Sequence, residues 1–117
     1  MHRLFLITAP LALVANLALA DLAAAQEPVV GVWKTQVGTT ATIAECGDGF
    51  CITMKTGEHA GQKIGSFTGT GSNFTGTIIE PDSKKTFDGV LTVSGDTVKM
   101  RGCTMKVICR SLIWTRM

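Results

Sequence analysis

The segment Gly57–Gly61 holds the residues best suited to acid–base chemistry, because it places His59 directly after Glu58. A histidine can act as a general base near neutral pH when a neighbouring group orients its ring. Flanking glycines are also typical of a solvent-exposed loop, and the hydroxyls of Ser66 and Ser111 have no G-x-S-x-G elbow around them. We therefore expect no catalytic residue and no enzyme activity. A hydrolase that uses His59 is the least favoured alternative.

Four cysteines could form disulfides or hold a metal ion: Cys46, Cys51, Cys103 and Cys109. Zinc binding by four thiolates is the rival interpretation, but the C-x4-C and C-x5-C spacings are looser than the C-x2-C of zinc knuckles. Disulfides are the default in a small exported domain, and the Gly-Asp-Gly sequence after Cys46 favours a hairpin turn. We expect the pairs Cys46–Cys51 and Cys103–Cys109, while the crossed pairings stay open. We expect no metal and no cofactor.

The first 25 residues have the pattern of a secretory signal peptide. A basic start at Met1–Arg3 precedes an apolar run over Leu4–Ala15, and small residues in A-x-A arrangement predict cleavage after Ala25 or Ala20. The apolar run is too short to cross a bilayer, which requires about 20 apolar residues, so we do not expect a membrane-spanning protein. The remaining residues 26–117 form one small domain, which we predict to be periplasmic or secreted.

The charge of the chain gives no reason to expect a nucleic-acid partner. Its 11 Lys and Arg residues exceed its 9 Asp and Glu residues by only two, and they are scattered along the sequence. A nucleic-acid-binding domain would instead show a basic patch or stripe.

The exported part alternates apolar and polar residues and shows no helical stripe. We expect eight strands: Val30–Thr35, Thr40–Glu45, Phe50–Lys55, Lys63–Thr70, Phe74–Ile79, Thr86–Val93, Thr97–Arg101 and Val107–Thr115. Turn residues separate them; in Glu80–Ser83, for example, Pro81 fixes φ and Asp82 binds its own backbone. Eight antiparallel strands joined by hairpins close most simply as an up-and-down barrel. The sequence predicts an all-β, lipocalin-like barrel, with a β-sandwich as the alternative.

The alternation places one set of apolar side chains inside this barrel. The set comprises Ile43, Phe50, Ile52, Met54, Phe67, Phe74, Ile78, Phe87, Leu91, Val93, Val98 and Met100. An eight-stranded barrel is just wide enough for packed side chains or for one small ligand. The candidate walls of a ligand site are Phe50, Met54, Phe67, Phe74 and Phe87.

The two ends of the exported part each carry a tryptophan, Trp33 and Trp114. The first and last strands are neighbours in a closed barrel, so the two indoles should meet there and plug one end. The guanidinium of Arg116 can lie across an indole face, where cation–π attraction and packing favour it. We predict that Trp33, Trp114 and Arg116 form a structural floor, and that the loops opposite them surround an open end.

Several segments, taken together in their order and spacing, resemble one family. They are residues 31–33, 43–51, 74–82, 85–87, 101–103, 109–111 and 114–116. The chain resembles the exported proteins of the bacterial domain-of-unknown-function family 2147. The resemblance implies a lipocalin-type barrel and implies no particular biochemical role. This sequence departs from the family in its shorter loop over Thr56–Lys63 and in Phe87, which replaces a common tyrosine.

The fold and the inner aromatic residues predict that the protein binds a small apolar or amphipathic ligand. The alternative is a structural or protein-interaction module of the cell envelope whose barrel is filled. A continuous cavity of about 300 Å³ or more would favour the ligand, whereas a solid interior would favour the module.

Overall fold

The computed structural model describes residues 27–104 and 108–117. The predicted signal peptide over residues 1–25 lies outside the described residues. Eight strands follow one another along the chain: β1 (Gly31–Lys34), β2 (Thr40–Cys46), β3 (Gly49–Met54), β4 (Lys63–Thr70), β5 (Asn73–Ile79), β6 (Thr86–Ser94), β7 (Thr97–Thr104) and β8 (Ile108–Arg116). The part of the chain that the structure describes forms no helix that is long and apolar enough to cross a membrane.

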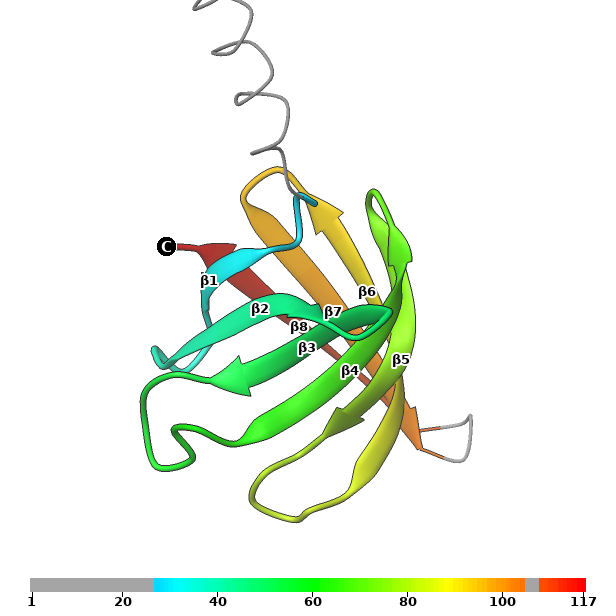
Figure 1. The fold of residues 1–117 in the computed structure, drawn as a ribbon. Helices are drawn as coiled ribbons and strands as arrows, with labels where there is room; N and C mark the ends of the chain where they lie inside the picture. The colour runs from blue at the N-terminus through cyan, green and yellow to red at the C-terminus, as the bar shows by residue number, and fades with distance from the viewer. Residues whose placement is uncertain (1–26, 105–107) are drawn as a thin grey trace, which may run out of the picture.

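The eight strands form one closed barrel in which each strand pairs with its sequence neighbours. Every pairing is antiparallel, and β1 pairs with β8 to complete the cylinder (Figure 1). The closing pair is short, since it joins only Trp33 to Arg116 and Lys34 to Thr115. The predicted up-and-down barrel is confirmed, and the β-sandwich alternative is wrong.

The strand limits differ most from the prediction in β7, which continues to Thr104 instead of ending at Arg101. The cause is the pairing of β7 with β8, in which Cys103 lies directly opposite Cys109. The ladder therefore runs through both cysteines to the end of the hairpin. Because of this extension, Gly102 lies within β7 and directly opposite Arg110 on β8. Both residues line the cavity described below.

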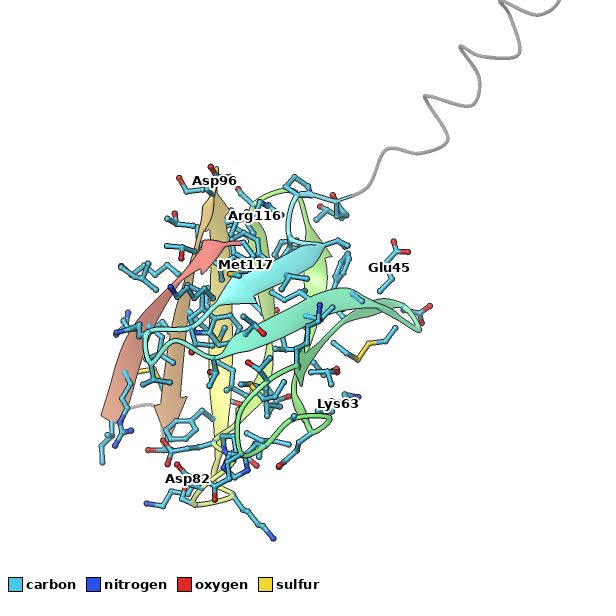
Figure 2. The ribbon with its side chains drawn as sticks, turned by 90° about the vertical axis from the view of Figure 1, so that its left-hand side faces the viewer. Glu45, Lys63, Asp82, Asp96, Arg116 and Met117 are labelled. Carbon is cyan, nitrogen blue, oxygen red and sulfur yellow. A yellow bond between two sulfur atoms is a disulfide. The ribbon has the colours of Figure 1, made fainter. Side chains whose placement is uncertain are left out.

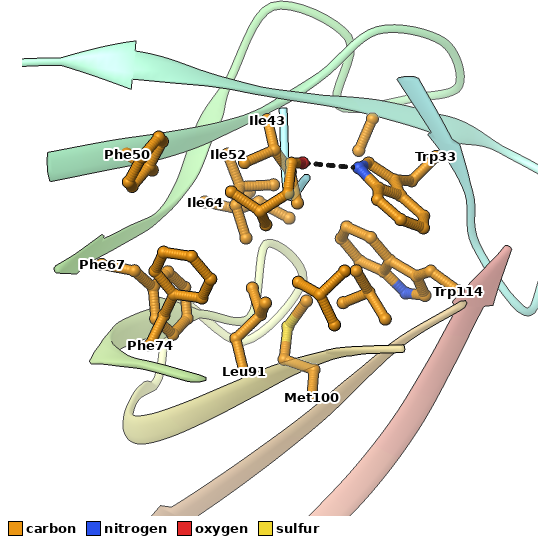
Figure 3. Packing of buried hydrophobic residues seen from close by; sticks show 14 of the residues in the cluster. Trp33, Ile43, Phe50, Ile52, Ile64, Phe67, Phe74, Leu91, Met100 and Trp114 are labelled. Atoms are coloured by element: carbon orange, nitrogen blue, oxygen red, sulfur yellow. Dashed lines mark hydrogen bonds between the residues drawn. The ribbon is translucent and has the colours of Figure 1, made fainter. Parts of the chain in front are cut away.

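The barrel interior is packed with apolar side chains from all eight strands and from Val29 (Figure 3). The buried residues are Val29, Trp33, Ala41, Ile43, Phe50, Ile52, Met54, Ile64, Phe67, Phe74, Leu91, Val93, Val98, Met100 and Trp114. The set predicted from alternation is buried except for Ile78 and Phe87, which are half-buried. Those two residues lie where the packing gives way to a cavity.

Ile64 is buried although alternation counted from Phe67 would turn it outward. The register between β3 and β4 shifts at this point: Ile52 lies opposite Gly65, but Thr53 lies opposite Lys63. Ile64 is the additional residue of this β-bulge, and a bulge re-aims the side chains around it. A strict two-residue period therefore misses this core position.

Three inward-facing glycines lie in register on neighbouring strands: Gly76 on β5, Gly89 on β6 and Gly102 on β7. A Cβ atom at Gly76 would collide with the carbonyl oxygen of Ser66, and one at Gly89 would lie 2.8 Å from Cδ1 of Ile78. The missing side chains allow the sheet to coil tightly around the core. Of the three, Gly102 lines the cavity described below, whereas Ile78 and Phe67 pack over Gly89.

Near the seam between β1 and β8, aromatic and basic side chains close one end of the barrel. Nε1 of Trp33 donates a hydrogen bond to the carbonyl oxygen of Val29 at 3.0 Å, and the Cζ atom of Arg116 lies 4.2 Å from the centroid of the Trp33 ring. Nη1 of Arg116 donates to the carbonyl oxygen of Val30 at 3.3 Å. Trp114 is also buried and points into the same core (Figure 3). The structure thus brings Trp33, Trp114 and Arg116 together at this closed end.

Both expected disulfides are confirmed: Cys46–Cys51 and Cys103–Cys109. The first crosses the β2–β3 hairpin diagonally, since Cys46 lies opposite Gly49. The second joins two directly opposed residues near the ends of β7 and β8. Two disulfides in so small a domain are compatible with an extracytoplasmic protein.

Candidate functional site

The barrel contains a cavity of about 520 Å³ that opens at the end opposite Arg116. Figure 2 shows Asp82, which lines the cavity, at one end of the barrel and Arg116 at the other. The opening is surrounded by the β1–β2, β3–β4 and β5–β6 loops, which follow one another along the left and lower edge of the barrel in Figure 1. The predicted open end, opposite the tryptophans, is therefore where the structure has its cavity.

The inner wall of the cavity is apolar. Its apolar lining residues are Val37, Met54, Ile64, Ile78, Ile79, Pro81, Phe87, Met100, Leu112 and Trp114. Met54, Ile64, Met100 and Trp114 also belong to the buried core, so they form the deepest part of the cavity. Such a wall favours the aliphatic or aromatic part of a ligand, whose transfer from water is favourable in proportion to the area buried.

The structure divides the five candidate wall residues into two groups. Met54 and Phe87 line the cavity. Phe50, Phe67 and Phe74 do not line it, because they pack together in the part of the core that lies away from Trp33 and Trp114 (Figure 3). The rings of Phe50 and Phe74 meet edge to face with their centroids 5.3 Å apart, a favourable aromatic geometry. These three phenylalanines therefore complete the packed half of the barrel.

Leu112 and Ile113 on β8 show how the strand separates the cavity from the outer surface. Leu112 lines the cavity, and its 40% exposure reflects its position in that open space. Ile113 is 53% exposed and is not a lining residue, because successive strand residues point to opposite faces. The two neighbours offer a matched pair of apolar positions, one inside and one outside.

Charged groups gather at the mouth of the cavity rather than within it. Nε2 of His59 lies 2.8 Å from Oδ1 of Asp82. This contact joins the β3–β4 loop to the β5–β6 loop. His59 is partly shielded, with 27% of its side chain exposed, whereas Asp82 is 83% exposed. Glu58 lines the same mouth.

The two loops that carry these groups are held by backbone hydrogen bonds. In the β3–β4 loop the amide of Ala60 donates to the carbonyl of Gly57 at 3.2 Å, and the amide of Gln62 donates to the carbonyl of His59 at 3.0 Å. In the β5–β6 loop the amide of Glu80 donates to the carbonyl of Lys85 at 2.9 Å. The mouth is therefore built from two tight turns, which fix where the charged side chains begin.

A second ion pair crosses the mouth from β8 to the β5–β6 loop. Nη1 of Arg110 lies 3.1 Å from Oε2 of Glu80. The other carboxylate oxygen of Glu80 accepts a hydrogen bond from Oγ of Ser83 at 2.6 Å. The guanidinium of Arg110 is thus already paired with the Glu80 carboxylate, whose position is fixed by the hydrogen bond from Ser83.

Glu58, His59 and Asp82 are the described residues whose side chains could together ligate a metal ion. One ligand atom from each lies within 4.8 Å of the others. Exposed carboxylates often gather without an ion, and His59 already has a partner in Asp82. The group is therefore best described as a polar mouth.

The geometry around His59 bears on the hydrolase alternative. An activated nucleophile requires a hydroxyl or thiol within hydrogen-bond reach of the base, and the base in turn requires an orienting group. Asp82 supplies the orienting carboxylate, but among the described residues no hydroxyl is hydrogen-bonded to His59. Both pairs of cysteines are used in disulfides. The described residues around His59 therefore include an orienting carboxylate, Asp82, but no hydroxyl or thiol that is hydrogen-bonded to the imidazole.

Sequence reasoning missed four of the residues that define the cavity: Ile64, Asp82, Arg110 and Leu112. Asp82 reads as a turn former, and it does sit in a turn, but nothing local indicates that the turn faces His59 from 23 residues away. Leu112 could have been found by extending the inward alternation backward from Trp114 along β8.

An eight-stranded antiparallel barrel, closed at one end and hollow at the other, defines a lipocalin-like protein. The chain belongs to the bacterial family described as "Uncharacterized protein conserved in bacteria (DUF2147)", whose match covers residues 55–116. This range contains most of the strands that form the cavity. It also contains the loops that carry His59 and Asp82. No curated protein and no solved structure matches the chain.

Proposed function

We propose that this protein binds one small amphipathic molecule, with the apolar part inside the barrel and the polar part at the mouth. The observation that carries this proposal is the cavity itself. Its volume of about 520 Å³ lies within the range of roughly 300–1,000 Å³ that is usual for small-molecule sites. An eight-stranded barrel has room for one small ligand, as lipocalins illustrate.

The distribution of polarity supports an amphipathic ligand over a purely apolar one. The deep residues Met100 and Trp114 offer only apolar surface and one indole N–H, whereas the mouth offers carboxylates, an imidazole and a guanidinium. A linear molecule would gain about 0.8 kcal/mol for each methylene group buried, before the costs of association. A polar head group would remain hydrated at the opening.

The alternative function, an envelope module with a filled barrel, expects a solid interior. The closed half of the barrel fits that description, but the half that contains Phe87 and Leu112 does not. We therefore propose a binding protein without enzymatic activity, acting in the periplasm or outside the cell.

Calorimetric titration of the exported domain with dodecanol tests this proposal. Dodecanol is uncharged, so its binding reports the cavity and not the charges at its mouth. We expect a single site per barrel. Replacing Leu112→Asn places an amide in the apolar wall and should weaken binding at least tenfold.

The matched control is Ile113→Asn, which makes the same kind of change on the outer face and should bind dodecanol as the wild type does. Equal effects of the two substitutions would contradict the proposal, and so would the absence of any saturable binding. Circular dichroism of both variants establishes that the barrel is intact.

A further inference from the structure

The mouth of the cavity is acidic although the chain as a whole is basic. Among the described lining residues, Glu58, Glu80 and Asp82 carry negative charge and Arg110 carries positive charge. With His59 neutral, the lining has two more negative than positive groups, whereas the complete sequence has a net charge of +2. The net charge of the cavity lining is thus opposite in sign to the net charge of the whole chain.

The only basic side chain fixed at charge +1 in this described lining is already engaged. Arg110 pairs with Glu80 at 3.1 Å, and its side chain is 69% exposed to solvent. The two carboxylates that remain, Glu58 and Asp82, lie next to His59, and one ligand atom from each of the three residues lies within 4.8 Å of the others. His59 could balance at most one of these two negative charges.

Four exposed lysines lie on or beside the same loops: Lys55, Lys63, Lys84 and Lys85. None of them lines the cavity. Charges on the outer surface are screened by salt over a Debye length of about 8 Å at physiological ionic strength, whereas a ligand head group in the mouth would contact the carboxylates directly. The lysines therefore weaken the local field, but they are not among the side chains that a head group in the mouth would contact.

We infer that the ligand is a cationic amphiphile, a primary ammonium group on an aliphatic chain. This inference rests on the proposed function, because the chain must occupy the cavity for the head group to reach the mouth. An ammonium group has three N–H donors and no acceptor. Glu58 and Asp82 provide carboxylate acceptors at the mouth. Of these oxygens, Oδ1 of Asp82 is the one that the imidazole of His59 already contacts. A carboxylate head group would meet like charges instead.

Competing titrations with dodecylamine, dodecanoate and dodecanol test this inference, with all three below their aggregation concentrations and with EDTA present. The three probes share one chain and differ only in the charge of the head group. We expect dodecylamine to bind about three- to fivefold more tightly than dodecanol and dodecanoate to bind more weakly than dodecanol, at low salt. The preference should shrink as salt is raised.

Substitutions at the mouth sharpen the test. The double variant Glu58→Gln, Asp82→Asn should abolish the preference for the amine, measured as the ratio of the dodecylamine and dodecanol affinities in that same variant. Arg110→Gln releases Glu80 and should strengthen the preference. The matched control is Glu45→Gln with Asp88→Asn, which removes two exposed carboxylates that do not line the cavity.

The outcomes separate the two proposals. If dodecanol binds but dodecanoate binds as tightly as dodecylamine, the ammonium inference is overturned and the amphiphile-binding function stands. The inference is equally overturned if the double variant keeps the amine preference, because the selectivity would then have another origin. If none of the three probes binds, the proposed function itself is wrong.

Discussion

Arg116 and Trp33 lie in register on the two strands that close the barrel, and the guanidinium covers the indole at 4.2 Å. The same guanidinium donates to the carbonyl oxygens of Pro28 and Val30. Gly31 has a φ of 151°, and a Cβ atom there would lie only 2.8 Å from Nη1 of Arg116, so a side chain at this position would displace the guanidinium. These contacts join the last strand to the chain that precedes the first one.

Replacing Arg116→Gln should lower the free energy of unfolding by about 1–3 kcal/mol, because it removes the cation–π contact and two hydrogen bonds. Urea unfolding followed by tryptophan fluorescence measures the change. The control is Asp96→Asn, which removes only an exposed carboxylate 3.5 Å from Arg116 and should cost less than about 0.5 kcal/mol. A loss of equal size in both variants would contradict the assignment of Arg116 to the closure.

The row of inward glycines predicts two very different alanine substitutions. Gly76→Ala should prevent folding or cost more than about 3 kcal/mol, because the new methyl group collides with a backbone carbonyl that cannot move independently. Gly102→Ala places its methyl group 3.2 Å from Cβ of Phe87, beside the cavity, and should cost no more than about 1.5 kcal/mol. Thermal unfolding of the two variants checks this order, and the reverse order would show that the row does not set the coiling of the sheet.

Each disulfide closes a short loop, with sequence separations of 5 and 6 residues. In the chain-entropy account, loops of this length stabilise by about 2 kcal/mol. Replacing both cysteines of either pair by serine should therefore lower the free energy of unfolding by about that amount, and the two pairs should behave alike. Unfolding in urea measures both variants. A loss near zero for either pair would mean that the bridge does not constrain the unfolded chain.

The fold could be predicted from the sequence because its signals are local. Alternation along each strand, turn residues between strands and hairpin-length connections together determine an up-and-down barrel. The position of the barrel's closing seam was also predictable, since Trp33 and Trp114 stand on the first and last strands. The inward position of Ile64 was not, because it depends on a bulge between β3 and β4 that no local residue pattern announces.

The site was less predictable than the fold because it depends on where packing stops. Phe50, Phe67 and Phe87 have the same chemistry and the same inward orientation. Only the depth at which each strand places its residue decides that Phe50 and Phe67 fill the core while Phe87 faces open space. The meeting of His59 with Asp82 likewise follows from two loops that share one end of the barrel, a relation between distant segments.

The cavity also predicts how affinity depends on the length of the ligand. In a series of linear alcohols, each added methylene group should strengthen binding about fourfold, from roughly 0.8 kcal/mol per group, until the chain reaches the deep residues Met100 and Trp114. Longer chains should gain nothing more, because the closed end is packed. Calorimetry over the series checks this. A steady gain without a plateau would indicate adsorption to the outside of the barrel.

Quenching of tryptophan fluorescence by ω-bromododecanol tests the central claim, that a ligand enters the barrel tail first, most directly. Trp114 lines the deep end of the cavity and Trp33 does not, so the bromine at the tail should contact only Trp114. Trp33→Phe, which keeps Trp114, should show strong saturable quenching, and Trp114→Phe, which keeps Trp33, should show little. Equal quenching of the two variants, or none in either, would contradict the account.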